Sequence, residues 1–214
     1  MLEMFRDLEV AGDSAALDGL VDRVSSRLPS GWTRDLDRDR NHGARGDVKL
    51  LAFRRKGGAA APDASLFLAR RPDRFWVTNI VAVKASPLTR SQYNAILEDF
   101  AERAVRPAAD ELGLPIAISD EQVPITRWIS DEAAIRLRRF SNSANKGTGS
   151  SHPVDFEHWA AFLIQVHREK SDLTAETLQQ WLVEEAQWPA DTADSLALEF
   201  RFARDLLTAY DGER

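Results

Sequence analysis

The segment FWVTNIVAVKASPLTRSQYNAILEDFAERAV, residues 75–105, joins a strand-like run to an amphipathic helix. In residues 75–83, strict alternation would place Trp76, Thr78, Ile80 and Ala82 on one face of a strand. The opposite face would also be largely apolar. We therefore expect a central strand that is covered on both sides.

The helix that follows has a clear start signal. Thr89 and Gln92 have the spacing of a capping box, in which each side chain satisfies the backbone amide of the other residue. Apolar residues then recur at helical spacing up to Ala104. Pro107 is expected to bend or end this helix, and Gly113 to stop the chain in a left-handed conformation.

Two more strand-like runs precede this segment. VKLLAFRR (48–55) and SLFLARR (65–71) are separated from each other and from residue 75 by short turn-forming breaks. Short breaks favour antiparallel hairpins, and PIAIS (115–119) predicts a fourth strand. We expect a helix over 14–28, capped by Asp13 or Ser14, and a short helix containing Leu2, Phe5 and Leu8. The fold class is α+β, with an antiparallel sheet of three or four strands packed by helices.

From Ser130 onward the pattern predicts only helices, with caps at Ser130, Thr174 and Asp191. The expected organisation is an α+β domain over residues 1–125 and a helical C-terminal section over 126–214. We expect the second section to dock on the first, and one continuous domain is the alternative.

The composition excludes several classes of site. The 214 residues include no cysteine, so disulfides, thiolate metal sites and a cysteine nucleophile are absent. No apolar run approaches the ~18 residues of a membrane span, and the N-terminus lacks the pattern of a signal peptide. Arginine far outnumbers lysine and alanine is abundant, which favours a bacterial source. We expect a soluble, cytoplasmic protein without a cofactor or a membrane partner.

The loop SNSANKGTGSSHP, residues 141–153, contains the residue types that bind phosphates. A phosphate loop requires a strand before it and a lysine after its last glycine, and neither is present. The plainer interpretation is a hinge. Gly147 or Gly149 ends one helix, Ser150 or Ser151 caps the next, and Pro153 begins it. One alternative stays open, because Lys146 and His152 could contact an anion at that helix start.

Arginines gather near one predicted end of the sheet. A meander would bring Arg38 and Arg45, together with Arg34 and Arg40, near Arg70, Arg71 and Arg74. Arginine suits phosphate and carboxylate, but five aspartates are interleaved with these residues. Mutual salt bridging is therefore the simpler explanation. The histidines form no metal-binding motif; Asp155 and His158 share a helix face, but nothing nominates a third ligand.

No catalytic signature emerges from these patterns. The formal net charge is −6 and residues 155–214 are strongly acidic, which suits a basic protein partner. The first hypothesis is a protein-interaction or regulatory module of the antitoxin or immunity kind, with no catalytic activity assigned. The alternative is a nucleotide- or nucleic-acid-binding protein or enzyme. It would use the arginines at the sheet edge (Arg38, Arg45, Arg71 and Arg74) and the loop with Lys146 and His152.

Overall fold

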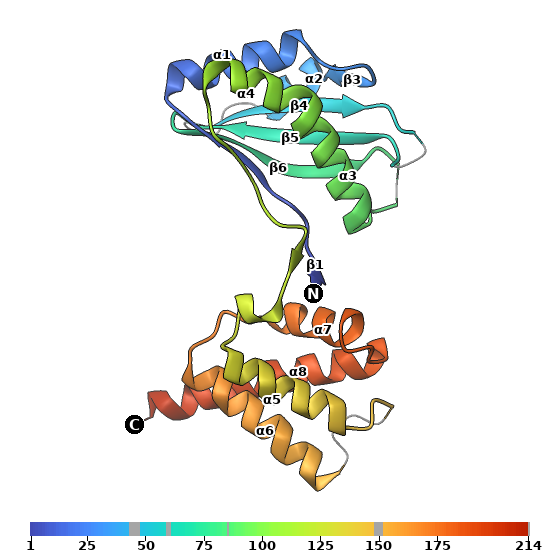
Figure 1. The fold of residues 1–214 in the computed structure, drawn as a ribbon, viewed down its shortest axis with the longest axis vertical. Helices are drawn as coiled ribbons and strands as arrows, with labels where there is room; N and C mark the ends of the chain where they lie inside the picture. The colour runs from blue at the N-terminus through green and yellow to red at the C-terminus, as the bar shows by residue number, and fades with distance from the viewer. Residues whose placement is uncertain (43–47, 59–60, 85, 148–151, 214) are drawn as a thin grey trace. The chain divides into compact units, whose positions relative to one another are not determined.

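A computed structural model describes residues 1–42, 48–58, 61–84, 86–147 and 152–213 (Figure 1). The chain forms two compact units. Residues Met4–Glu121 make the sheet unit, and Met1–Glu3 with Gln122–Arg214 make the helical unit. The chain therefore passes between the two units twice.

The sheet unit contains a six-stranded antiparallel sheet in the order β3-β4-β5-β6-β2-β7 (Figure 1). Its strands are β2 (Leu8–Ala11), β3 (Trp32–Arg34), β4 (Lys49–Arg55), β5 (Ala64–Arg70), β6 (Arg74–Ala82) and β7 (Ile116–Ile118). The α+β class and the β4-β5-β6 meander are confirmed. The prediction of three or four strands is wrong, because β2 and β3 were not expected.

The two unexpected strands are short. β2 has four residues, and only Leu8 and Val10 alternate inward, which is too little pattern to separate a strand from a helix. The short helix expected over Leu2, Phe5 and Leu8 is therefore wrong. Leu2 lies instead in β1 (Leu2–Glu3), which pairs with β8 (Gln122–Val123) in the helical unit.

A bulge in β6 overturns the expected side-chain alternation. Phe67 pairs with Asn79 while Leu68 pairs with Val77, so Thr78 is an extra residue in β6. Phe75 and Val77 lie in the core before the bulge, and Ile80 lies in the core after it. Trp76 and Ile80 therefore face opposite sides of the sheet, because one additional residue reverses the alternation.

Helices pack on the core face of the sheet (Figure 1). They are α1 (Ser14–Ser26), α3 (Arg90–Phe100) and α4 (Arg106–Leu112). A π-helical turn, Ala101–Val105, joins α3 to α4 just before Pro107. The predicted Asp13 cap, the Thr89–Gln92 capping box and the left-handed Gly113 (φ 66°) are all confirmed. The short α2 (Leu36–His42) lies beside β4, where Asp39 accepts the Ala52 amide at 2.6 Å.

The helical unit contains α5 (Asp131–Ser143), α6 (Pro153–Arg168), α7 (Ala175–Glu184) and α8 (Ala190–Gly212), with a 3₁₀ turn at Ile125–Arg127. The Ser130 and Thr174 caps are confirmed. The Asp191 cap is wrong, because α8 begins at Ala190 and its N-cap is Pro189, two residues before Asp191. Aromatic rings pack together in the core of this unit. The ring centre of Phe140 lies 4.8 Å from that of Trp159 and 5.5 Å from that of Trp188.

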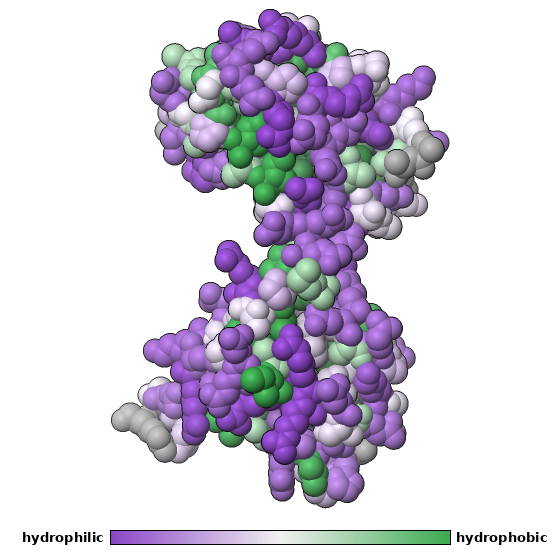
Figure 2. Space-filling model, viewed as in Figure 1, coloured by the Kyte–Doolittle hydropathy of each residue, from purple (hydrophilic) through white to green (hydrophobic). Residues whose placement is uncertain are grey.

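Both units present a mostly polar surface on the face drawn in Figure 2, interrupted by local apolar patches. Among the residues that the structure describes, no helix is long and apolar enough to cross a membrane.

Candidate functional site

The arginines predicted near the sheet end fall into two groups. Arg38 donates to the Ser65 hydroxyl at 2.8 Å, lies 3.6 Å from Asp35 and is 5.8 Å from the centre of the Phe67 ring. Arg34 is similarly paired with Asp39 at 2.8 Å. These contacts hold α2 against the sheet. Arg45 and the Arg40 side chain lie outside the described residues.

Arg71 and Arg74 form the second group: Arg71 lies in the turn between β5 and β6, and Arg74 is the first residue of β6. Their guanidinium carbons lie 5.7 and 4.8 Å from the centre of the Trp76 ring. Neither forms an ion pair with any acid that the structure describes. Arg70 differs from them, because it is buried against α1, where it donates to Ser14 and lies 3.1 Å from Asp18.

The two side chains proposed as anion contacts in the 141–153 loop both bond to the backbone. The Lys146 ammonium donates to the Ala186 carbonyl at 2.6 Å. His152 is the N-cap of α6, and its Nδ1 accepts the Val154 amide at 3.3 Å. The expected serine cap is therefore wrong, although Pro153 begins α6 as predicted. Gly147 does not end α5, which ends at Ser143; Gly149, Ser150 and Ser151 lie outside the described residues.

The pair formed by Asp155 and His158 recruits no third ligand from the described residues, in which no group of three or more potential metal ligands occurs. His158 Nδ1 lies 3.1 Å from the Ser143 hydroxyl and thereby links α6 to α5. His167 forms a contact of 2.8 Å with Asp211 of α8. Both histidines therefore connect helices.

Charge is divided unequally between the units. Residues 4–121 carry 18 basic and 18 acidic side chains, whereas the helical unit carries 10 basic and 16 acidic ones. The whole formal charge of −6 therefore lies on the helical unit. Within it, α8 has five acidic residues and two arginines, and Glu213 follows directly after the helix. A basic partner would be attracted to this unit rather than to the sheet.

The same helix exposes an apolar surface. Four large residues, spaced four apart, share one side of α8: Leu198, Phe202, Leu206 and Tyr210. Their exposed fractions are 59, 68, 56 and 51%. We call this surface the α8 face. The buried residues of α8, among them Leu196 and Phe200, lie on the other side, and none of residues 201–213 is buried.

Acidic side chains border the α8 face. At ~100° per residue, Glu199, Asp205 and Glu213 project within or beside the arc of the four apolar residues. Glu199 is also fixed, because its carboxylate accepts the indole N–H of the buried Trp159 at 3.1 Å. An exposed apolar strip with an acidic border is a typical feature of an interaction surface.

This face was not identified from the sequence, because helical spacing alone does not show which apolar residues of a helix are buried. Tyr210 is half-exposed in the structure. The available signal was that α8 is apolar on two opposite sides, while one side suffices to pack a surface helix.

The chain matches no protein-family model, no curated protein and no solved structure, so the support for any function comes from its own residues and geometry.

Proposed function

We propose that this chain is a protein-interaction module whose helical unit binds a basic, amphipathic segment of a partner protein along the α8 face. The observation that carries the proposal is the combination of Leu198, Phe202 and Leu206, all exposed, with a helix that has five acids and two arginines. The role is the protein-interaction or regulatory one expected from the sequence.

Two physical effects support a partner of this chemistry. Burial of large apolar side chains supplies affinity, at about 25 cal/mol per Å² of apolar surface. The acidic border attracts a basic partner and repels an acidic one, which supplies specificity and speeds association. An apolar segment bordered by Lys or Arg satisfies both requirements.

The proposal is tested with two defined peptides. One is an amidated helical peptide of ~14 residues with leucines on one face and lysines on the other, and the second replaces every lysine by glutamate. Amide chemical shifts of the ¹⁵N-labelled protein should move in residues 198–213 with the basic peptide, less so as salt rises. Equal binding of both peptides, or shifts elsewhere, would contradict the proposal.

A matched pair of variants separates this face from general stickiness. Phe202→Glu with Leu206→Glu adds two charges to the α8 face, whereas Ile135→Glu with Val154→Glu adds two at exposed apolar positions on α5 and α6. Only the first pair should abolish binding of the basic peptide. If the unmodified chain forms a dimer that the first pair dissociates, the face serves a second copy and the proposal is wrong.

A second candidate function is the binding of single-stranded nucleic acid beside Trp76. Its supporting observation is that Arg71 and Arg74 lie over that ring without an acidic partner among the described residues. Binding of an oligonucleotide of about 12 bases should then fall steeply with salt. Arg71→Ala with Arg74→Ala should remove the binding, and Arg54→Ala, toward the other end of the sheet, should not. Unchanged affinity in the double variant would exclude this function.

A further inference from the structure

One edge of β6 lacks a strand neighbour over much of its length. β2 pairs with β6 only at Arg74, Phe75 and Trp76, and no other described strand pairs with this edge beyond that point. The Val83 amide donates toward β5, to the Asp63 carbonyl, at 2.9 Å. Because antiparallel strands alternate, the backbone groups of Ile80 and Ala82 point to the open edge.

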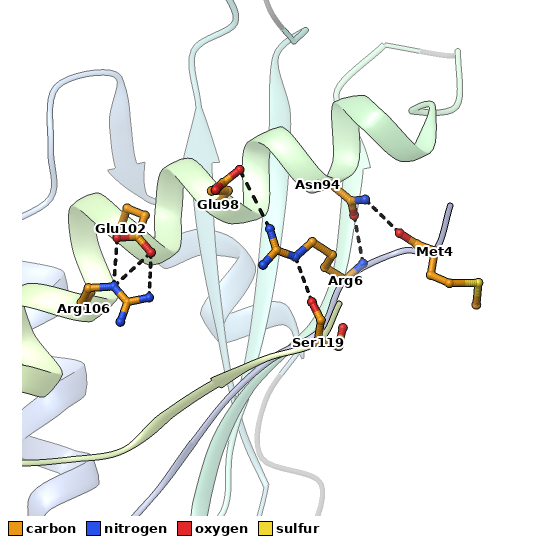
Figure 3. Close-up of polar contacts among 7 residues, drawn as sticks. All are labelled: Met4, Arg6, Asn94, Glu98, Glu102, Arg106 and Ser119. Carbon is orange, nitrogen blue, oxygen red and sulfur yellow. Dashed lines mark hydrogen bonds and ion pairs between the residues drawn. The ribbon is translucent and has the colours of Figure 1, made fainter. Parts of the chain in front are cut away.

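The segment before β2 is held away from this edge by one buried side chain. Asn94 of α3, only 3% exposed, accepts the Arg6 amide at 2.9 Å and donates to the Met4 carbonyl at 2.8 Å (Figure 3). The segment thus bonds to α3 through these two contacts, and the pairing of β2 with β6 stops at Trp76. The Phe5 ring between these two anchors packs edge-on against Tyr93, with ring centres 4.9 Å apart.

A cavity of about 650 Å³ lies along the open edge. Residues 79–82 and Lys84 line its strand side, and Phe5, Leu88 and Tyr93 line the other. We call it the β6 groove. The lining is mainly apolar, which suits the side chain of a bound peptide.

The charge of the β6 groove is positive. Lys84 is its one charged lining residue, and it forms no ion pair with any acid in the described part of the chain. The groove adjoins the N-terminal end of α3, which has no acid in its first turn and carries Arg90, whose guanidinium lies 5.7 Å from the Phe5 ring centre. A helix N-terminus adds further positive potential. A bound segment that carries a carboxylate would complement this positive charge.

The edge is also partly protected. Asn79 turns its side-chain oxygen onto the Ile80 amide at 2.8 Å and so occupies a donor that an added strand would use. Blocking of exposed edges is a common defence against unwanted strand pairing. The contact joins neighbouring residues, and the carbonyl of an added strand would take the place of the Asn79 oxygen at the Ile80 amide.

We propose that the β6 groove binds an extended segment of a partner protein, which adds to β6 as an antiparallel strand. An apolar side chain of the segment fills the cavity, and an acidic residue near its N-terminal end meets Lys84. The antiparallel direction follows from the rest of the sheet and from the slightly better hydrogen bonds of such pairs. The groove and the α8 face belong to different units, so the two proposals are independent.

The probe is an acetylated and amidated peptide of eight residues, with two glutamates at its N-terminal end and alternating threonine and valine after them. Amides of residues 77–84 should shift. In a second version of the peptide, a nitroxide group in place of the acetyl group should broaden the signals around Lys84. Broadening near Trp76 instead would overturn the antiparallel orientation. Shifts outside the groove, or an edge-to-edge dimer of the chain, would overturn the site.

Two variants distinguish strand addition from simple filling of a pocket. Asn79→Ala frees the Ile80 amide, so the peptide should bind about two- to tenfold more tightly; an unchanged affinity would refute strand addition. The unmodified chain should bind this peptide more tightly than a version in which lysines replace the two glutamates. Lys84→Glu should reverse that preference, whereas Lys49→Glu, an exposed control on β4, should not. Phe202→Glu with Leu206→Glu should leave this binding intact whether or not the α8 face is functional. Thermal unfolding checks that each variant is folded.

Discussion

The indole N–H of Trp32 donates to the Asp99 carboxylate at 2.7 Å and so joins β3 to α3 across 67 positions of sequence. Arg103 and Arg55 lie 2.9 and 3.6 Å from the same carboxylate. Burial by itself raises the pKa of Asp99, but hydrogen bonds from Trp32 and Arg103 and the charges of Arg103 and Arg55 lower it overall. The ionised carboxylate is therefore a fixed point between sheet and helix.

Trp32→Phe should lower the free energy of unfolding at neutral pH by about 1.5 to 3 kcal/mol, because a hydrogen bond to a charged group is lost. A group with a lowered folded pKa stabilises the fold above its unfolded pKa, and this contribution disappears as pH falls through the folded value. The difference from the unmodified chain should therefore narrow below roughly pH 4 in urea unfolding. A double-mutant cycle with Asp99→Asn isolates the pair; additive losses would show that Trp32 acts through packing alone.

Tyr93 lines the β6 groove, and its hydroxyl should ionise at a higher pH than an ordinary tyrosine. Burial first, and the charge of Asp7 second, raise the pKa of Tyr93 to about 12. The unfolded chain ionises near its ordinary value of ~10, so stability from this group is complete below that pH and is lost as pH rises to about 12. The pKa of Tyr93 is measured from the difference in tyrosinate absorbance between the unmodified chain and Tyr93→Phe as pH rises. Asp7→Asn should lower the pKa of Tyr93 only in part, because burial is the larger cause of the shift. Ionisation of Tyr93 near pH 10 in the unmodified chain would contradict its buried position.

Asn94→Ala should lower the free energy of unfolding by about 2 to 3 kcal/mol, because it leaves the Arg6 amide and the Met4 carbonyl without their partner. Hydrogen exchange at the Arg6 amide should accelerate accordingly. The matched control is Glu98→Gln, which removes an ion pair of 4.0 Å to Arg6 from a side chain that is 63% exposed (Figure 3). Exposed pairs of this kind contribute less than about 1 kcal/mol. Equal effects of the two variants would refute the anchoring role of Asn94.

Local chemistry explains which elements could be predicted from sequence. The Thr89–Gln92 capping box and the Gly113 stop depend on neighbours within a few residues, and both are present. β2 depends on distant partners, since Leu8 pairs with Ile118 and Glu9 with Trp76. The bulge at Thr78 has no sequence signal of its own, yet it reverses the faces of β6 and so shapes the groove.

The same distinction applies to the candidate surfaces. Interleaved acids and arginines predicted mutual pairing, and Arg34 and Arg38 are paired with Asp39 and Asp35. The acidity of the C-terminal helices could be predicted from the amino-acid composition alone. The α8 face was not, because an apolar residue such as Phe202 gives the same pattern whether another helix covers it or not. The open edge of β6 was not predictable either, because residues 4–6 bond to Asn94 by contacts across about 90 positions of sequence.

Lys146→Met tests whether the 141–153 loop serves the backbone or an anion. The ammonium donates to the Ala186 carbonyl, two residues past the end of α7, so methionine should keep most of the stem packing and lose the charged hydrogen bond. We expect a loss of about 1.5 to 3 kcal/mol in urea unfolding. Inorganic phosphate should leave the amide shifts of Lys146, Gly147 and residues 152–156 unchanged in both proteins. The backbone role predicts a loss of stability without phosphate binding. Phosphate-dependent shifts that disappear in Lys146→Met, without a loss of stability, would establish the anion contact instead.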